Sequence, residues 1–119
     1  MDKEILIIDD QVGIRMLLEK IFVSSGYHVC TLESGVDALH YLKEQVVDLI
    51  LLDYHLPVMN GSEIIEQMEH ANYQIPIILI SGFTTGLEER YAEHTNVKDV
   101  FGKPFDVKTL INRVEKILT

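Results

Sequence analysis

The sequence predicts a three-layer, doubly wound α/β fold, in which helices cover both faces of a five-stranded parallel sheet. Five apolar runs of strand length recur at nearly even spacing along the 119 residues, and stretches with helical periodicity separate them. The central runs are almost continuously apolar, which is expected of parallel strands that are buried on both faces. We therefore expect a (βα)5 chain that forms one domain without an internal boundary.

The individual elements follow from these runs and from local signals. The expected strands, in chain order, are residues 5–8, 27–32, 49–52, 75–80 and 97–101. The first helix presents an apolar face at i, i+3, i+4 and i+7, formed by Ile14, Leu17, Leu18, Ile21 and Phe22. The last helix has the same pattern in Val107, Leu110, Ile111, Val114 and Leu118. Gly26 is placed to end the first helix.

Three pairs of residues have the spacing of a helix-capping box, in which two side chains cap the first turn reciprocally. They are Ser34 with Asp37, Asn60 with Glu63, and Thr85 with Glu88. The segment 86–95 offers only Leu87, Tyr91 and Ala92 to a core. The helix expected there is therefore the least firmly held of the five.

Size and charge exclude several classes of protein. A chain of 119 residues builds one core and is too short for a two-domain enzyme. The net charge of −9 gives no electrostatic attraction for DNA, RNA or anionic lipid, so we expect neither direct nucleic-acid binding nor membrane binding. Cys30 has no second cysteine to pair with, and no apolar run is long enough to cross a membrane, so the expected location is the cytoplasm.

Polar side chains stand at the ends of four of the five expected strands. They are Asp9 and Asp10, Asp53, Ser81, and Lys103. In a parallel sheet these ends meet at one edge, and the flavodoxin-like strand order 2-1-3-4-5 makes the first and third strands neighbours. Considered alone, each of these residues has a simpler explanation: Asp10 could cap a helix, Ser81 could belong to a turn, and Lys103 could be a solvent-exposed charge. Their joint occurrence at one edge indicates a site.

Three ionised carboxylates in one pocket require a cation, since two unit charges 4 Å apart repel by about 4 kcal/mol at an effective dielectric of 20. Lys103 supplies one positive charge, and Mg²⁺ suits the oxygen ligands better than Ca²⁺. Zinc is not expected, because the five histidines are scattered. Asp53 is the candidate nucleophile for an acyl phosphate, with Asp9 and Asp10 holding the metal and with Lys103 and Ser81 contacting the phosphoryl group.

Several motifs together resemble the response-regulator receiver domain of two-component signalling. They are IDD at 8–10, GYHV at 26–29, DLILLDYHLPVMNG at 48–61, ILIS ending at Ser81 and KPFD at 103–106. The resemblance implies that Asp53 accepts phosphate from a histidine kinase, that Asp9, Asp10, Asp53 and the backbone carbonyl of His55 arrange Mg²⁺, and that Ser81 and Lys103 bind the phosphoryl group. It also implies a cis Lys103–Pro104 bond.

A narrower resemblance concerns DDQVGIR at 9–15 and KPFD, which are similar to the stand-alone phosphorelay proteins of spore-forming bacteria. It implies a single receiver domain over residues 1–119 with no output domain. Such a protein relays phosphate to a helical-bundle phosphotransferase and catalyses only its own phosphorylation and dephosphorylation. The alternative is a receiver-like protein-binding module that works without phosphorylation.

The expected partner surface is an apolar rim around the acidic pocket. It consists of Ile14, Leu17, Pro104 and Phe105, with Gln11 and His55 tuning the contact. The sequence departs from the family at Val100, where many receivers carry an aromatic side chain. This departure concerns the conformational switch used in signalling. Phe101 does not replace that side chain, since successive residues of a strand face opposite ways.

Overall fold

Five parallel strands form one sheet in the order β2-β1-β3-β4-β5, as the sequence predicts. The computed structural model describes residues 2–119. The strands are β1 (Glu4–Ile8), β2 (His28–Leu32), β3 (Leu49–Asp53), β4 (Ile77–Ser81) and β5 (Val97–Gly102). The helices are α1 (Val12–Ser24), α2 (Gly35–Glu44), α3 (Gly61–His70), α4 (Leu87–Arg90) and α5 (Val107–Leu118). β2 and β4 begin one and two residues later than the apolar runs suggest.

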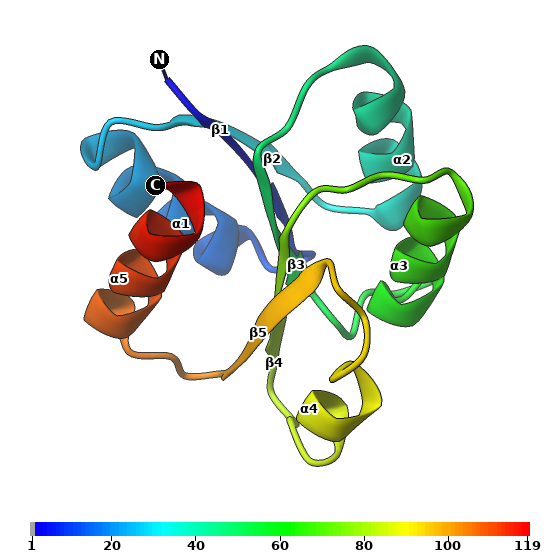
Figure 1. The fold of residues 1–119 in the computed structure, drawn as a ribbon. Helices are drawn as coiled ribbons and strands as arrows, with labels where there is room; N and C mark the ends of the chain where they lie inside the picture. The colour runs from blue at the N-terminus through cyan, green and yellow to red at the C-terminus, as the bar shows by residue number, and fades with distance from the viewer. Residues whose placement is uncertain (1) are drawn as a thin grey trace.

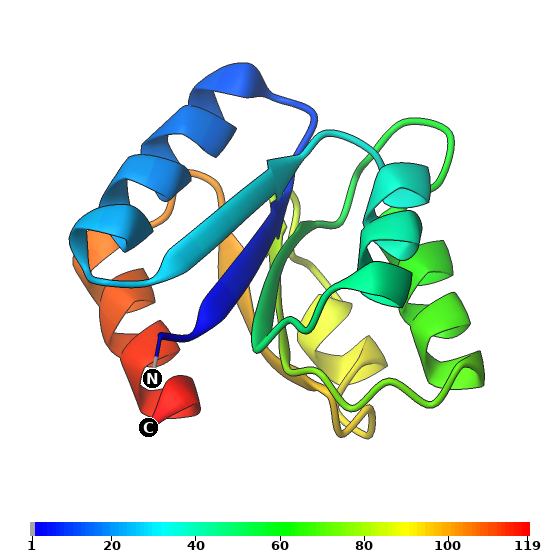
Figure 2. The same ribbon diagram turned by 90° about the horizontal axis from the view of Figure 1, so that it is seen from above.

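Helices cover both faces of the sheet and create two separate cores. α1 and α5 pack on one face, and α2, α3 and the short α4 pack on the other, with α4 beside the edge strand β5 (Figure 1 and Figure 2). Successive residues of a strand enter opposite cores, so that Leu49 and Leu51 face α1 and α5 while Ile50 and Leu52 face α2 and α3. This double burial explains why the central strands are apolar throughout.

The register of the strands brings their carboxyl ends level. Ile8 pairs with Leu52, so that Asp9 follows β1 beside the end of β3. Asp53 pairs with Ile80, and Ser81 pairs with Gly102. The polar residues that end four strands therefore lie along one edge of the sheet.

Most of the predicted helix signals are present. Gly26 has a left-handed φ of 95° after α1, and the backbone N–H of Tyr27 donates to the carbonyl of Phe22. Asn60 and Glu63 form the complete capping box of α3, with both reciprocal hydrogen bonds. Ser34 caps α2 by accepting a hydrogen bond from the N–H of Asp37.

The capping box predicted for Thr85 and Glu88 is wrong. α4 begins at Leu87, and its N-cap residue is Gly86, which has a φ of 79° and makes no side-chain cap. Thr85 lies one residue too early to reach the first turn. Only Leu87 and Tyr91 anchor this segment in the core, whereas Ala92 is exposed. The helix is accordingly reduced to four residues, in agreement with the prediction that this element is the least firmly held.

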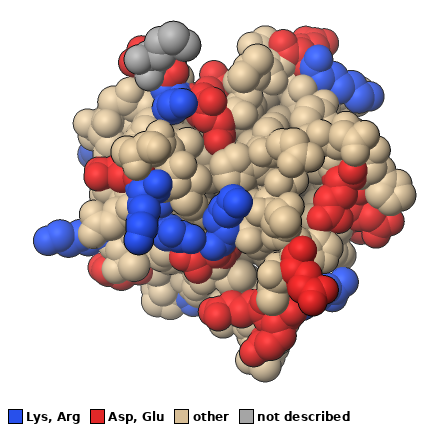
Figure 3. Space-filling model, in the orientation of Figure 1, with Lys and Arg blue, Asp and Glu red and all other residues tan. Residues whose placement is uncertain are grey.

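The surface charge is unevenly distributed between the elements. Lys and Arg side chains gather over β5 and α5, whereas Asp and Glu side chains gather over α3 and α4 (Figure 3). Within residues 2–119, no helix combines the length and the apolar character needed to span a bilayer.

Candidate phosphoacceptor site

Three carboxylates converge at the carboxyl edge of the sheet. Each of Asp9, Asp10 and Asp53 offers an oxygen, and these three oxygens lie within 4.8 Å of one another. Asp9 and Asp53 are 2% and 5% exposed, whereas Asp10 lies at the surface. Asp10 is not the cap of α1, because Gln11 occupies that position. The acidic cluster predicted from the strand ends is therefore present.

Lys103 provides the positive charge beside this cluster. Its ammonium donates to Asp9 Oδ2 at 2.9 Å and lies 3.5 Å from Asp53 Oδ2. The same group donates to Gln11 Oε1 at 2.9 Å. The backbone N–H of Lys103 donates to the carbonyl of Ser81, and the Lys103–Pro104 bond is cis, as the resemblance implied. Lys103 thus joins the ends of β1, β3 and β5.

Asp53 is buried at the end of β3. Burial raises the pKa of its carboxyl group above the usual range, and the nearby Asp9 carboxylate acts in the same direction. The backbone N–H of His55 donates to Asp53 Oδ1 at 3.1 Å and opposes this shift, as does the Lys103 ammonium. One carboxylate oxygen is therefore held by the following turn, while the other faces the lysine.

Ser81 is fully buried at the end of β4, but its hydroxyl is engaged with the loop that follows. It donates to the carbonyl of Phe83 at 2.8 Å and accepts from the N–H of Phe83 at 3.0 Å. A hydrogen bond from Ser81 to the acidic cluster is not present among the described residues. Contact with a phosphoryl group would require the hydroxyl to release the Phe83 carbonyl.

A shallow hollow of about 420 Å³ opens over the carboxylates. It is lined by Asp10, Gln11, Asp53, His55, Gly82, Phe83 and Lys103. The donor set fits Mg²⁺, which prefers a few carboxylate oxygens and leaves the other coordination positions to water and phosphate. The exposed Asp10 carboxylate accepts no hydrogen bond within residues 2–119, so its oxygens are available to a cation.

Only part of the predicted apolar rim is exposed. Leu17 is 43% exposed on α1, and Pro104 also lies at the surface. Ile14 and Phe105 are half-buried and pack against the core beneath α1 and α5. Gln11 is exposed beside these residues, and its side-chain oxygen accepts a hydrogen bond from Lys103.

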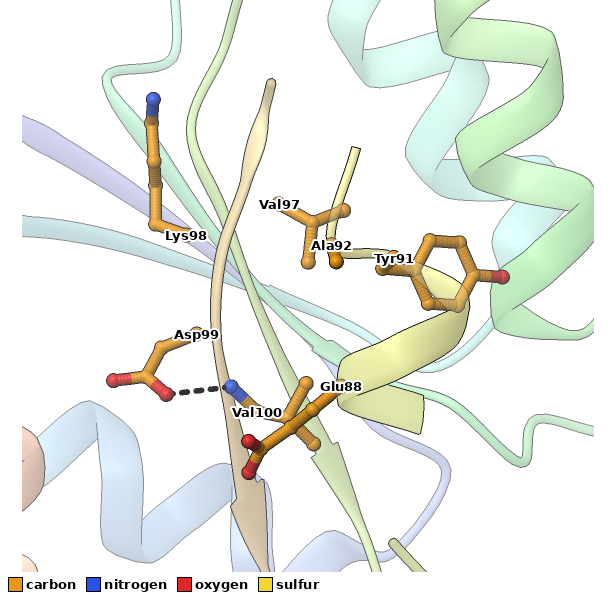
Figure 4. A pocket seen from close by; sticks show the side chains of 7 residues that line it. All are labelled: Glu88, Tyr91, Ala92, Val97, Lys98, Asp99 and Val100. Atoms are coloured by element: carbon orange, nitrogen blue, oxygen red, sulfur yellow. Dashed lines mark hydrogen bonds between the residues drawn. The ribbon is translucent and has the colours of Figure 1, made fainter. Parts of the chain in front are cut away.

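Val100, which replaces the aromatic residue of many receivers, lies beside a second hollow between α4 and β5. Val100 points toward Glu88 and Tyr91 of the α4 segment, while Asp99 points the other way (Figure 4). Phe101 belongs to the opposite core, under α1 and α5. The prediction that Phe101 does not replace an aromatic side chain at position 100 agrees with this arrangement.

One residue of the site was missed in the analysis of the sequence. Arg15 donates from Nη1 to the backbone carbonyl of Asp9 at 2.8 Å. Arg15 lies in the first turn of α1, which begins at Val12, two residues after Asp10. Its place in the DDQVGIR run at 9–15 was the available signal, but helical periodicity gives no reason to single it out.

A doubly wound α/β domain with three carboxylates and a lysine at the carboxyl edge of its sheet defines a signalling receiver domain. A family model described as "Response regulator receiver domain" matches residues 5–115. The chain is 33% identical over 118 residues to sporulation initiation phosphotransferase F of Bacillus subtilis. The alignment covers 99% of this chain and 95% of that protein. The chain belongs to the response-regulator receiver family.

Other comparisons support the same assignment. The chain is 31% identical over 115 residues to the response regulator SaeR of Staphylococcus aureus, and it spans 50% of the length of that protein. The structure of the chemotaxis response regulator CheY4 of Vibrio cholerae aligns with a TM-score of 0.87 and 25% identity, over 99% of this chain and 100% of that chain. A receiver domain from Pseudomonas fluorescens has the same fold, with a TM-score of 0.89 at 24% identity over 99% of this chain and 95% of that chain.

Proposed function

We propose that this receiver domain accepts a phosphoryl group on Asp53 from a phosphohistidine donor and relays it to a phosphotransferase of the helical-bundle type. The observation that carries the proposal is the placement of the Asp53 carboxylate, which is buried between an acidic pair and the Lys103 ammonium. Carboxylates that could hold a divalent cation, together with a lysine, are suited to neutralise the charge of a phosphoryl group. The similarity to a sporulation phosphotransferase supports the relay role.

The transfer is a displacement at phosphorus. Asp53 Oδ2, which faces Lys103, forms the new O–P bond, and the P–N bond of the donor breaks. The electron pair of that bond stays on the imidazole nitrogen, which takes up a proton from solvent. The other oxygen of Asp53 stays fixed by the N–H of His55. The reverse sequence of events passes the phosphoryl group to the histidine of the next protein.

The surrounding residues neutralise and orient the phosphoryl group. Asp9, Asp10 and Asp53, with the carbonyl of His55, would hold Mg²⁺, which when bound supplies positive charge to the phosphoryl oxygens. Lys103 donates to one phosphoryl oxygen after leaving Asp53, while it keeps its bond to Asp9. Ser81 donates its hydroxyl hydrogen to another oxygen once it releases Phe83.

Labelling with a small phosphoryl donor tests the proposal without a partner protein. Incubation with acetyl phosphate and Mg²⁺ is expected to add one phosphoryl group to the chain, because a small donor needs only the acidic pocket. A chelator is expected to prevent the labelling, and hydroxylamine is expected to remove the label, as it does from an acyl phosphate. Intact-mass measurement gives all three results.

A folded chain that stays unlabelled with Mg²⁺ would contradict the proposal. It would favour the alternative of a receiver-like protein-binding module that works without phosphorylation. Labelling that is equally efficient with the chelator would argue against a metal-dependent reaction and in favour of a different acceptor residue.

The apolar rim is the proposed docking surface for the donor protein and the phosphotransferase. Ile14→Ala and Leu17→Ala are each expected to slow phosphotransfer from a phosphohistidine protein by about tenfold, since a truncated interface anchor costs more than 1 kcal/mol. Labelling by acetyl phosphate should not change. The two rates are measured with the same protein preparations.

Val23→Ala is the matched control for the rim, because Val23 is an exposed apolar residue at the far end of α1. Its transfer rate should equal that of the wild type. If the rim variants lose both kinds of phosphorylation together, the rim supports the site itself and does not dock a partner.

A further inference from the structure

Arg15 connects two loops at the carboxyl edge of the sheet. Its side chain is only 18% exposed, and Nη1 donates to the backbone carbonyl of Asp9 at 2.8 Å. Nη2 lies 4.0 Å from an oxygen of Glu33, which follows β2. The short contact of Arg15 is therefore with the backbone of the acidic pair and not with any carboxylate of the pocket.

The Asp9 residue is restrained at each of its polar groups. Its N–H donates to the carbonyl of Leu32 at 3.1 Å, and Oδ1 accepts from the N–H of Gln11 at 2.9 Å. Oδ2 accepts from Lys103. The remaining group is the carbonyl, and Arg15 supplies its partner.

The orientation of that carbonyl also determines where Asp10 lies. The peptide group is planar, so fixing the oxygen of Asp9 fixes the nitrogen of Asp10 and the direction in which its chain continues. The Asp10 carboxylate accepts no hydrogen bond from any described residue. Its approach to Asp9 and Asp53 therefore depends on the backbone, and Arg15 is the one side chain within residues 2–119 that hydrogen-bonds the Asp9–Asp10 peptide group.

We infer that Arg15 is a positioning residue of the acidic pocket, which holds the Asp9–Asp10 peptide so that the Asp10 carboxylate reaches the same cation as Asp9 and Asp53. The inference rests on the proposed function of this pocket as a Mg²⁺-dependent phosphoacceptor site. A guanidinium is suited to the role, because it stays charged and forms a strong hydrogen bond to a carbonyl.

Positioning and electrostatics predict opposite effects when Arg15 is replaced. A positive charge next to a cation site repels the cation, so its removal would tighten Mg²⁺ binding if charge were all that mattered. Loss of the hydrogen bond to Asp9 would instead free the peptide group and weaken binding. The sign of the change in affinity therefore separates the two roles.

The experiment measures Mg²⁺ binding by titration calorimetry, at fixed ionic strength and without a phosphoryl donor. Arg15→Met keeps the length of the side chain and is expected to weaken binding by about tenfold, which is the lower end of the effect of residues that orient metal ligands. Arg15→Lys keeps the charge but loses the planar guanidinium with its fixed N–H donors, so we expect an affinity between those of Arg15→Met and the wild type. Lys20→Met is the matched control, because it removes one positive charge from an exposed position on the same helix.

The outcomes distinguish this inference from the function on which it rests. A wild-type chain that binds no Mg²⁺ would overturn both. Wild-type binding with equal or tighter binding by Arg15→Met would overturn only the positioning role. Equal loss in Lys20→Met would also overturn it, since Lys20 makes no contact with the Asp9–Asp10 peptide and the weaker binding would then not report the hydrogen bond of Arg15 to Asp9. If Arg15→Met does not fold, Arg15→Lys decides, and an affinity equal to that of the wild type contradicts the inference.

Discussion

Asp53→Asn is expected to reduce phosphorylation by acetyl phosphate to the limit of detection. The substitution keeps the shape of the side chain but replaces a carboxylate nucleophile with a neutral amide, which does not form an acyl phosphate. Asp99→Asn is the matched control, since Asp99 lies on β5 and forms an ion pair with Arg113 away from the pocket. Its labelling should equal that of the wild type, and labelling of the Asp53→Asn chain would show that another residue is the acceptor.

The same substitution is expected to stabilise the fold in the absence of Mg²⁺. The Asp53 carboxylate is buried near the carboxylates of Asp9 and Asp10, and Lys103 offsets only part of their repulsion. Since two charges 4 Å apart repel by about 4 kcal/mol at a dielectric of 20, a net gain of about 1–2 kcal/mol is expected at neutral pH. Urea unfolding of both chains measures this difference in the free energy of unfolding.

The difference in stability should depend on pH with a defined sign. Burial, followed by the Asp9 carboxylate, raises the pKa of Asp53 in the folded protein. The folded chain therefore holds this proton more tightly than the unfolded chain. The wild type gains the corresponding stability as pH falls through the raised pKa, and the gain is complete below the unfolded pKa. The advantage of Asp53→Asn should accordingly be largest at neutral pH and shrink in acid.

The sheet and the acidic site could be predicted because they follow from patterns with few alternatives. Runs that are apolar at every position are compatible with strands buried on both faces, and such strands imply a parallel sheet. Once the strand order is known, residues that end β1, β3 and β5 must meet at one edge. Asp9, Asp10, Asp53 and Lys103 could therefore be grouped although up to 94 residues separate them.

The details that could not be predicted depend on local backbone conformation and on long side chains. α4 begins only after the left-handed Gly86, and the spacing of Thr85 and Glu88 does not reveal that conformation. The hydroxyl of Ser81 donates to the carbonyl of Phe83 in the loop that follows β4. The sequence does not indicate whether this hydroxyl contacts that loop or the acidic cluster. Arg15 donates to a backbone carbonyl, and every residue has one, so the residue types do not indicate which carbonyl it contacts.

Lys103→Met is expected to slow phosphorylation by acetyl phosphate by about 10²–10³-fold, which is the usual loss when one fixed donor to a developing charge is removed. Lys103 is the basic side chain nearest to Asp53, and its ammonium lies 3.5 Å from Asp53 Oδ2. Without Mg²⁺ the variant should also lose about 1–3 kcal/mol of stability, because Asp9 keeps a buried charge that has lost its ionic partner. Lys98→Met, an exposed substitution on β5, the strand that precedes Lys103, should change neither quantity.

The Mg²⁺ affinity of Lys103→Met distinguishes its role from that of Arg15. Lys103 contacts the carboxylates directly, so its removal takes a competing cation from the pocket and should tighten Mg²⁺ binding even as phosphorylation slows. Arg15 contacts the pocket only through the backbone carbonyl of Asp9, and its removal should weaken binding. Two substitutions that each delete one positive charge beside the same pocket would then shift the affinity in opposite directions. Weaker Mg²⁺ binding by Lys103→Met would mean that the lysine organises the carboxylates for the metal, and the assignment of Lys103 to the phosphoryl group alone would be wrong.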